Sequence, residues 1–209
     1  MKINKLDLFI SILFIMSSTA FAQTSEEGWI TLFDGETLNN WAAAENPETF
    51  SIEDGKIVVD GPRAHLFYNG PVENHDFDDF VFKADIMTME NANSGIFFHT
   101  QYQEEGWPAH GYEAQVNNSY DPDPRRTASL YNVDDNTEIT FPDEEWFTMT
   151  IRVEGQHITI MVNDEVITDY TEPEDVDRGT NVLSSGTFAL QGHDPDSRVF
   201  YKNIRVKPL

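Results

Sequence analysis

Short runs of alternating apolar and polar residues dominate the chain after its N-terminal segment. Strict alternation is typical of half-buried β-strands, and helical spacing of apolar residues is almost absent. In residues 147–153, for example, apolar side chains alternate with Thr148, Thr150 and Arg152. Strands are predicted at residues 29–33, 50–52, 56–59, 80–86, 94–101, 112–117, 127–133, 147–153, 157–162, 165–170, 187–192 and 199–206.

Turn residues separate these runs. Glu53-Asp54-Gly55 and Glu154-Gly155-Gln156 predict tight hairpins, because glycine adopts positive φ at no steric cost. About ten or more antiparallel strands without an internal repeat favour an all-β fold, a two-sheet antiparallel β-sandwich of the jelly-roll type. The first and last strands are expected to lie near each other, as chain termini often do.

The N-terminal segment has the order of a secretory signal peptide. A basic head, residues 1–5, precedes an apolar run over residues 8–16, and small residues end at Ala20-Phe21-Ala22 before Gln23. The apolar run is too short to span a bilayer, which needs about 20 apolar residues. The sequence therefore predicts a signal peptide at 1–22, one β-sandwich domain at 23–209, and an exported protein that is periplasmic or extracellular.

Cleavage of this segment is a testable expectation. When the protein is expressed in a Gram-negative host, N-terminal sequencing of the mature form should begin at Gln23, because the A-x-A site ends at Ala22. A mature protein that still carried residues 1–22 would contradict export by this route.

Charge and cysteine content narrow the classes of partner. The chain has a formal charge of −24 and no cysteine. Like charge repels nucleic acid and anionic membrane surfaces, so neither is an expected partner. Disulfides and a cysteine-linked lipid anchor are excluded.

The predicted strands at residues 94–101, 112–117 and 187–192 each have an apolar face. Their opposite faces are rich in carboxylate, amide and imidazole groups. Each could be the wet side of an antiparallel sheet. However, glycines that allow close approach of a ligand bound these strands at Gly95, Gly111 and Gly192. The polar side chains of these faces are His99, Glu113, Gln115, Gln191 and His193.

Aromatic residues in the adjoining loops favour a sugar site, since sugars stack on aromatic rings and hydrogen-bond to convergent amides and carboxylates. The ring-bearing residues of these loops are Tyr102, Trp107, His110 and Tyr131.

Metal-binding patterns are weak outside these strands. The H-E-x-x-H motif and cysteine are absent, which argues against a structural zinc. The Asp-rich loops at 121–123 and 134–135 could hold Ca²⁺, although EF-hand spacing is missing. The remaining histidines, His65, His75 and His157, are expected at the surface.

Several segments in the same order resemble the 3-keto-disaccharide hydrolase domain family. Residues 32–41 match its L-F-D-G-x-x-L-x-x-W opening, and the likeness extends over residues 28–209. Residues 121–131 depart from the family pattern and leave the leaving group open. The other matching segments are residues 50–55, 79–80, 93–97, 111–116 and 202–209.

The resemblance implies a concanavalin A-like jelly roll and an exported enzyme that cleaves glycosides already oxidised at C3. A C3 ketone acidifies the C2 proton, so a base can remove it, the C1 oxygen leaves by β-elimination, and water adds to the enone. Such a reaction needs a base, a group that stabilises the enolate, and an acid. Glu113 or His99 could be the base and His193 the acid.

The remaining candidates would bind the substrate, a small oligosaccharide or glycoside. Gln115 and Gln191 could orient its hydroxyls or the enolate. Trp107, His110 and Tyr131 could hold its rings. The sequence identifies no certain cofactor, and a divalent metal on His99, Glu113 and His193 would stabilise the enolate equally well.

Two other function classes compete with this enzyme. The same fold supports a non-catalytic carbohydrate-binding module or lectin, because fold does not fix function. A cell-surface interaction domain without a small-molecule pocket is the third class. The Glu and His content of the polar faces exceeds what binding alone needs, which favours the enzyme.

Overall fold

The computed structural model describes residues 27–209. The predicted signal peptide, residues 1–22, lies outside the described residues. No helix in the described part of the chain is long and apolar enough to cross a membrane.

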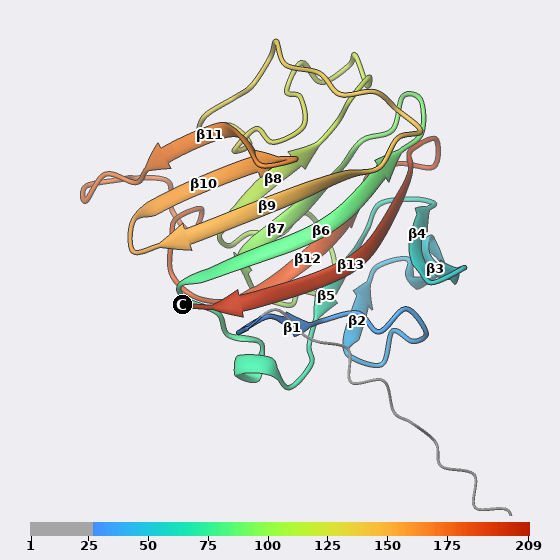
Figure 1. Ribbon diagram of the computed structural model, residues 1–209, viewed down its shortest axis with the longest axis horizontal. Coiled ribbons are helices and arrows are strands. Elements are labelled where there is room, and N and C mark those ends of the chain that lie inside the picture. The colour runs from blue at the N-terminus through green and yellow to red at the C-terminus, as the bar shows by residue number, and fades with distance from the viewer. Residues whose placement is uncertain (1–26) are drawn as a thin grey trace, which may run out of the picture.

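Two antiparallel sheets lie face to face in two layers (Figure 1), which confirms the predicted jelly-roll sandwich. The larger sheet contains, in spatial order, β11 (Glu165–Thr171), β10 (His157–Val162), β9 (Phe147–Glu154), β6 (Phe80–Thr88), β13 (Arg198–Pro208), β4 (Lys56–Asp60) and β3 (Phe50–Glu53). The smaller sheet contains β2 (Trp41–Ala44), β5 (Ala64–Tyr68), β12 (Thr187–Gly192), β7 (Ser94–Thr100) and β8 (Tyr112–Val116). Helix in residues 27–209 is confined to two 3-10 turns, η1 (Pro47–Thr49) and η2 (Val72–His75).

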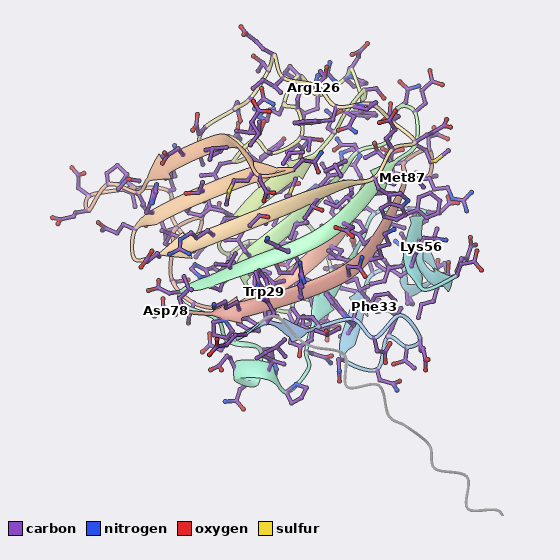
Figure 2. All side chains as sticks on the ribbon, in the orientation of Figure 1. Trp29, Phe33, Lys56, Asp78, Met87 and Arg126 are labelled. Carbon is purple, nitrogen blue, oxygen red and sulfur yellow. The ribbon has the colours of Figure 1, made fainter. Side chains whose placement is uncertain are left out.

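The two chain ends pair as predicted. β1 (Ile30–Thr31) joins β13 with Ile30 opposite Val206. Beside this pair, Trp29 lies between two cations on the outward face of the larger sheet (Figure 2), with Lys83 Nζ at 5.3 Å and the Arg205 guanidinium carbon at 4.9 Å from its ring.

The core fills the space between the sheets with alternate side chains of each strand. β6 alternates buried and half-buried residues along its whole length, as its sequence pattern predicts. Phe188 of β12 contacts Phe80 and Phe82 across the layers, with ring centroids 4.9 and 4.6 Å apart. Because the inward faces are apolar, the polar faces of the smaller sheet point away from the core.

One predicted strand, residues 127–133, is wrong. This segment follows the open edge of β8 as an irregular loop, where left-handed residues at Ala128 (φ 69°) and Asn132 (φ 61°) prevent a strand. Burial does not alternate here, since Thr127 and Ser129 are as fully buried as Ala128 and Leu130. Backbone hydrogen bonds from Ala128 N to Gln115 O (2.9 Å) and from Tyr131 N to Glu113 O (3.0 Å) hold it in place.

Candidate active site on the smaller sheet

The outward face of the smaller sheet brings together side chains from β5, β12, β7 and β8. On β8, Glu113 and Gln115 point outward because they alternate with buried Tyr112 and Ala114. Register places Gln191 of β12 opposite His65 of β5, and it places Gly95 of β7 opposite Gln115. Residues distant in sequence therefore share one patch of sheet.

Glu113 lies directly over the backbone of Gly95. A Cβ atom added to Gly95 would be 2.2 Å from Glu113 Oε1, so any larger residue would occupy the space of the carboxylate. Gln191 Nε2 donates a hydrogen bond of 2.8 Å to the same oxygen. Desolvation by burial raises the pKa of Glu113 to about 8, and the Gln191 hydrogen bond offsets this only in part.

Two cavities meet at Glu113 and Tyr131, which line both of them. The first, of about 190 Å³, is here called the Trp107 cavity, and the second, of about 270 Å³, the Arg178 cavity. The Trp107 cavity is also lined by Asn93, Trp107, Gln115, Asp123, Gln191 and His193. The Arg178 cavity is also lined by Phe97, Pro108, Gly111, Tyr112, Asn132, Val133, Arg178 and Asn181.

The loop beside β8 sets the position of Tyr131. The backbone bond from Tyr131 to Glu113 fixes the two residues side by side. The Arg125 guanidinium carbon lies 4.5 Å from the centre of the Tyr131 ring. Burial, followed by the negative charge of Asp123, raises the pKa of the Tyr131 hydroxyl. The Tyr131 side chain, with its hydroxyl protonated, is therefore held in place where it lines both cavities.

His193 is oriented by its chain neighbour. Its Nδ1 hydrogen-bonds to Asp194 Oδ2 at 2.7 Å, and its ring lies 5.5 Å from those of Trp107 and Tyr120. Burial opposes ionisation of Asp194, but hydrogen bonds from His193, Ser197 and the Asp196 backbone together keep its pKa below the usual value. An ionised partner on Nδ1 leaves the other ring nitrogen available to a ligand.

His65 corrects the prediction of a surface histidine, since only 1% of it is exposed. Its ring lies 5.4 Å from Phe97 and 5.5 Å from Trp107. Desolvation lowers its pKa to about 4, so the imidazole is neutral at physiological pH. Its Nε2 and the neighbouring Gln191 Oε1 are buried atoms without a hydrogen-bond partner in the described structure. Strand position alone could not show that the 101–111 loop covers this side chain.

His99 does not join the site, contrary to the sequence prediction. Between Thr187–Ala189 and Phe97–Thr100 the register shifts by one residue, and His99 has φ 53°, so a β-bulge interrupts the alternation of β7. The buried His99 Nε2 hydrogen-bonds to Asp78 O at 2.8 Å, and Nδ1 accepts from Ser184 N at 3.2 Å. Figure 2 shows Asp78 on the opposite side of the molecule from Arg126, which belongs to the loop after β8.

The predicted metal sets are not assembled. With His99 turned away, Glu113 and His193 lack their third ligand, and no group of three His, Asp or Glu side chains in residues 27–209 is arranged to hold a metal ion. The Asp-rich loops are held by ion pairs instead. Arg125 bridges Asp123 and Asp135 at 3.1 Å each, and Arg126 pairs with Asp121 at 2.9 Å.

Six of the predicted site residues therefore line the two cavities: Glu113, Gln115, Gln191, His193, Trp107 and Tyr131. His110 lies in the same loop as Trp107 but lines neither cavity. Sequence reasoning missed Asn93, whose Oδ1 accepts a bond of 3.1 Å from Gln115 Nε2, and Arg178, whose loop carried no strand signal.

The sequence profile of the 3-keto-alpha-glucoside-1,2-lyase-like domain matches residues 28–207. The chain belongs to this family. A 3-keto-disaccharide hydrolase of Bacteroides thetaiotaomicron is 28% identical over 88% of this chain and 79% of its own length.

Solved structures share the fold. One from Parabacteroides distasonis ATCC 8503, provisionally assigned as a glycosyl hydrolase, superposes with a TM-score of 0.73 at 21% identity and covers 88% of this chain and 94% of its own. The lumenal domain of VIP36 superposes with a TM-score of 0.58 at 10% identity and covers 88% and 90%.

Proposed function

We propose that the protein cleaves 3-keto-glycosides by β-elimination followed by hydration, with Glu113 as the base. The observation that carries this proposal is the position of Glu113 at the junction of two cavities, with its pKa raised to about 8. A general base works best when its pKa lies near the working pH. The name of the Bacteroides relative and the family profile support the same substrate class.

The two cavities fit the two halves of a disaccharide. We place the keto ring in the Arg178 cavity, because a guanidinium there would stabilise the negative oxygen that develops at C3. The leaving sugar then occupies the Trp107 cavity, where Trp107 offers a stacking surface and Gln115 an amide. The C2 proton and the C1 oxygen lie at the junction.

In the first step Glu113 takes the C2 proton and the C2–H electrons form the enolate. The enolate then collapses: the C3 carbonyl returns, a C1–C2 double bond forms, and the C1–O bond breaks. His193, held by Asp194, donates a proton to the departing oxygen. Water next adds to C1 and a proton returns to C2, which releases the 3-keto sugar.

A binding module is the second candidate, because a lectin-type fold and two sugar-sized cavities are all that binding requires. The environment of Glu113 distinguishes the enzyme from the binding module. A carboxyl group desolvated to a pKa of about 8 costs folding energy when ionised, and neutral hydrogen-bonding groups would bind hydroxyls without that cost.

The decisive experiment supplies a 3-keto-glucoside with a nitrophenol aglycone. We expect the wild-type protein to release nitrophenol faster than a protein-free blank at the same pH, which corrects for the spontaneous elimination of keto sugars. A transient enone absorbance before hydration would identify the elimination step. Binding without release would favour the module, and neither would favour an interaction domain; both outcomes overturn the proposal.

A further inference from the structure

A third cavity, separate from the candidate active site, opens at the other end of the smaller sheet. Its volume is about 370 Å³, and it forms where the end of β5, the η2 turn, the residues after β7 and the start of β12 come together. It shares no lining residue with the Trp107 or Arg178 cavity. Its lining includes Asn69, Asn74, Thr100, Gln101 and Tyr102.

Packed aromatic side chains lie between this cavity and the active site. Phe67 and Phe97 belong to one buried cluster on the outward face of the sheet. Phe67 lines the third cavity and Phe97 the Arg178 cavity. Tyr102 packs against Phe67 with ring centroids 5.4 Å apart, while 53% of Tyr102 stays exposed. The tyrosine therefore presents a supported ring to a ligand.

The polar groups around this ring have no partners within the protein. The side-chain amides of Asn69, Asn74 and Gln101 hydrogen-bond to no other group in residues 27–209. The hydroxyl of Thr100 is fully buried and also unpaired there. A buried hydroxyl without a partner carries a desolvation cost that a ligand hydroxyl would remove.

The η2 turn presents Asn74 in a costly conformation. Glu73, Asn74 and His75 are all left-handed, with φ of 47°, 53° and 52°. Left-handed backbone is unfavourable for Glu73 and His75, although Asn tolerates it better, and such strain gathers at ligand sites. Val72 N donates to Tyr68 Oη at 3.4 Å, and His75 Nδ1 hydrogen-bonds to Gly70 O at 3.2 Å, so the turn is tied to the cavity wall.

We infer that this cavity is a second, non-catalytic carbohydrate site, which holds a neutral pyranose residue on Tyr102 beside the Asn69, Asn74 and Gln101 amides. An aromatic ring with unpaired amides is the combination that recognises sugars. No Lys or Arg lines the cavity, whose one carboxylate is Asp76 and whose one imidazole is His75. Uronic and sulfated sugars would lack a cation there.

The test is a nuclear magnetic resonance titration of isotope-labelled protein with unoxidised cellotetraose, maltotetraose and mannotetraose, each to about 10 mM, which detects dissociation constants near 1 mM. At least one should shift the amide signals of Asn69, Asn74 and Gln101 in a saturable manner. Tetragalacturonate, which is anionic, should not. These sugars carry no ketone, so the result does not depend on turnover.

Two variants locate the binding. Tyr102→Ala should weaken it about tenfold or more. Asn74→Gly removes the amide while glycine accepts the left-handed backbone, so it should weaken binding without unfolding the turn. Trp146→Ala, which removes an exposed aromatic ring that contacts Lys202 of the larger sheet, is the matched control and should leave binding unchanged.

Turnover separates this site from the active site. Tyr102→Ala should release nitrophenol from the small 3-keto-glucoside at the wild-type rate. Failure of the amides to shift with any of the three neutral sugars would overturn the proposal. So would shifts confined to the two active-site cavities, equal binding of tetragalacturonate, or binding that survives both Tyr102→Ala and Asn74→Gly.

Discussion

Glu113→Gln is expected to lower kcat/KM for a 3-keto-glucoside by about 10²–10⁴, the usual contribution of a general base. The substitution keeps the volume of the side chain over Gly95 and removes only its ability to take a proton. The measurement is initial release of nitrophenol, corrected for the protein-free rate. Because Glu113 of the wild type has a pKa of about 8, wild-type kcat/KM should rise as pH approaches that value, and the variant should lose this rise.

Stability provides the control for this variant. The raised pKa means that folded Glu113 retains a proton which the unfolded chain releases above its ordinary value of 4.5, so stability is lost as pH rises from 4.5 through about 8. Glu113→Gln should therefore melt like the wild type near pH 4.5 and be more stable by up to about 5 kcal/mol at about pH 9. A normal fold with near wild-type turnover would show that Glu113 is not the base.

Gly95→Ala should reduce turnover by about 10²-fold while the protein still folds. The new methyl group would lie 2.2 Å from Glu113 Oε1, so the carboxylate must move and lose its bond from Gln191. A displacement of about 1 Å at a reacting group can cost this much. The measurement is kcat/KM together with the melting temperature.

Two comparisons identify the cause of that loss. Gly61→Ala, whose methyl group would lie 2.7 Å from Thr49 Oγ1 in another turn, is a matched steric change outside the cavities and should leave turnover intact. Adding Glu113→Gln to Gly95→Ala should cost little more, because both act on one carboxylate. Full additivity of the two losses would mean that Gly95 acts by another route.

Period-2 alternation was a reliable guide where a strand alternates in sequence, but it missed β2 and β5, whose sequences do not alternate. It placed Glu113, Gln115 and Gln191 on the outward face, because β8 and β12 alternate without interruption there. It failed at His99, where a bulge that no local residue type signals turns the side chain inward. It also failed at residues 127–133, where the apolar alternation of the sequence belongs to a loop packed along a strand edge.

Side chains that are covered by distant loops could not be predicted at all. His65 is buried only because the 101–111 loop places Trp107 over it, and the long-range packing of a loop leaves no periodic trace in sequence. The ion pairs of Arg125 with Asp123 and Asp135 likewise occupy carboxylates that the sequence offered to Ca²⁺. The burial of His65 depends on contacts between segments far apart in the chain, and the Arg125 ion pairs depend on how residues 123–135 fold back on themselves.

The loop along β8 has a consequence beyond the placement of Tyr131. An edge strand with unpaired backbone groups can recruit a strand from another chain and so begin aggregation. The loop forms backbone hydrogen bonds with Gln115 and Glu113 through Ala128, Ser129 and Tyr131. These bonds occupy the backbone groups on the outer edge of β8. The same short segment thus protects the sheet from intermolecular strand pairing and forms a wall of the two cavities. Resistance to aggregation and the shape of the binding cleft therefore depend on the same residues.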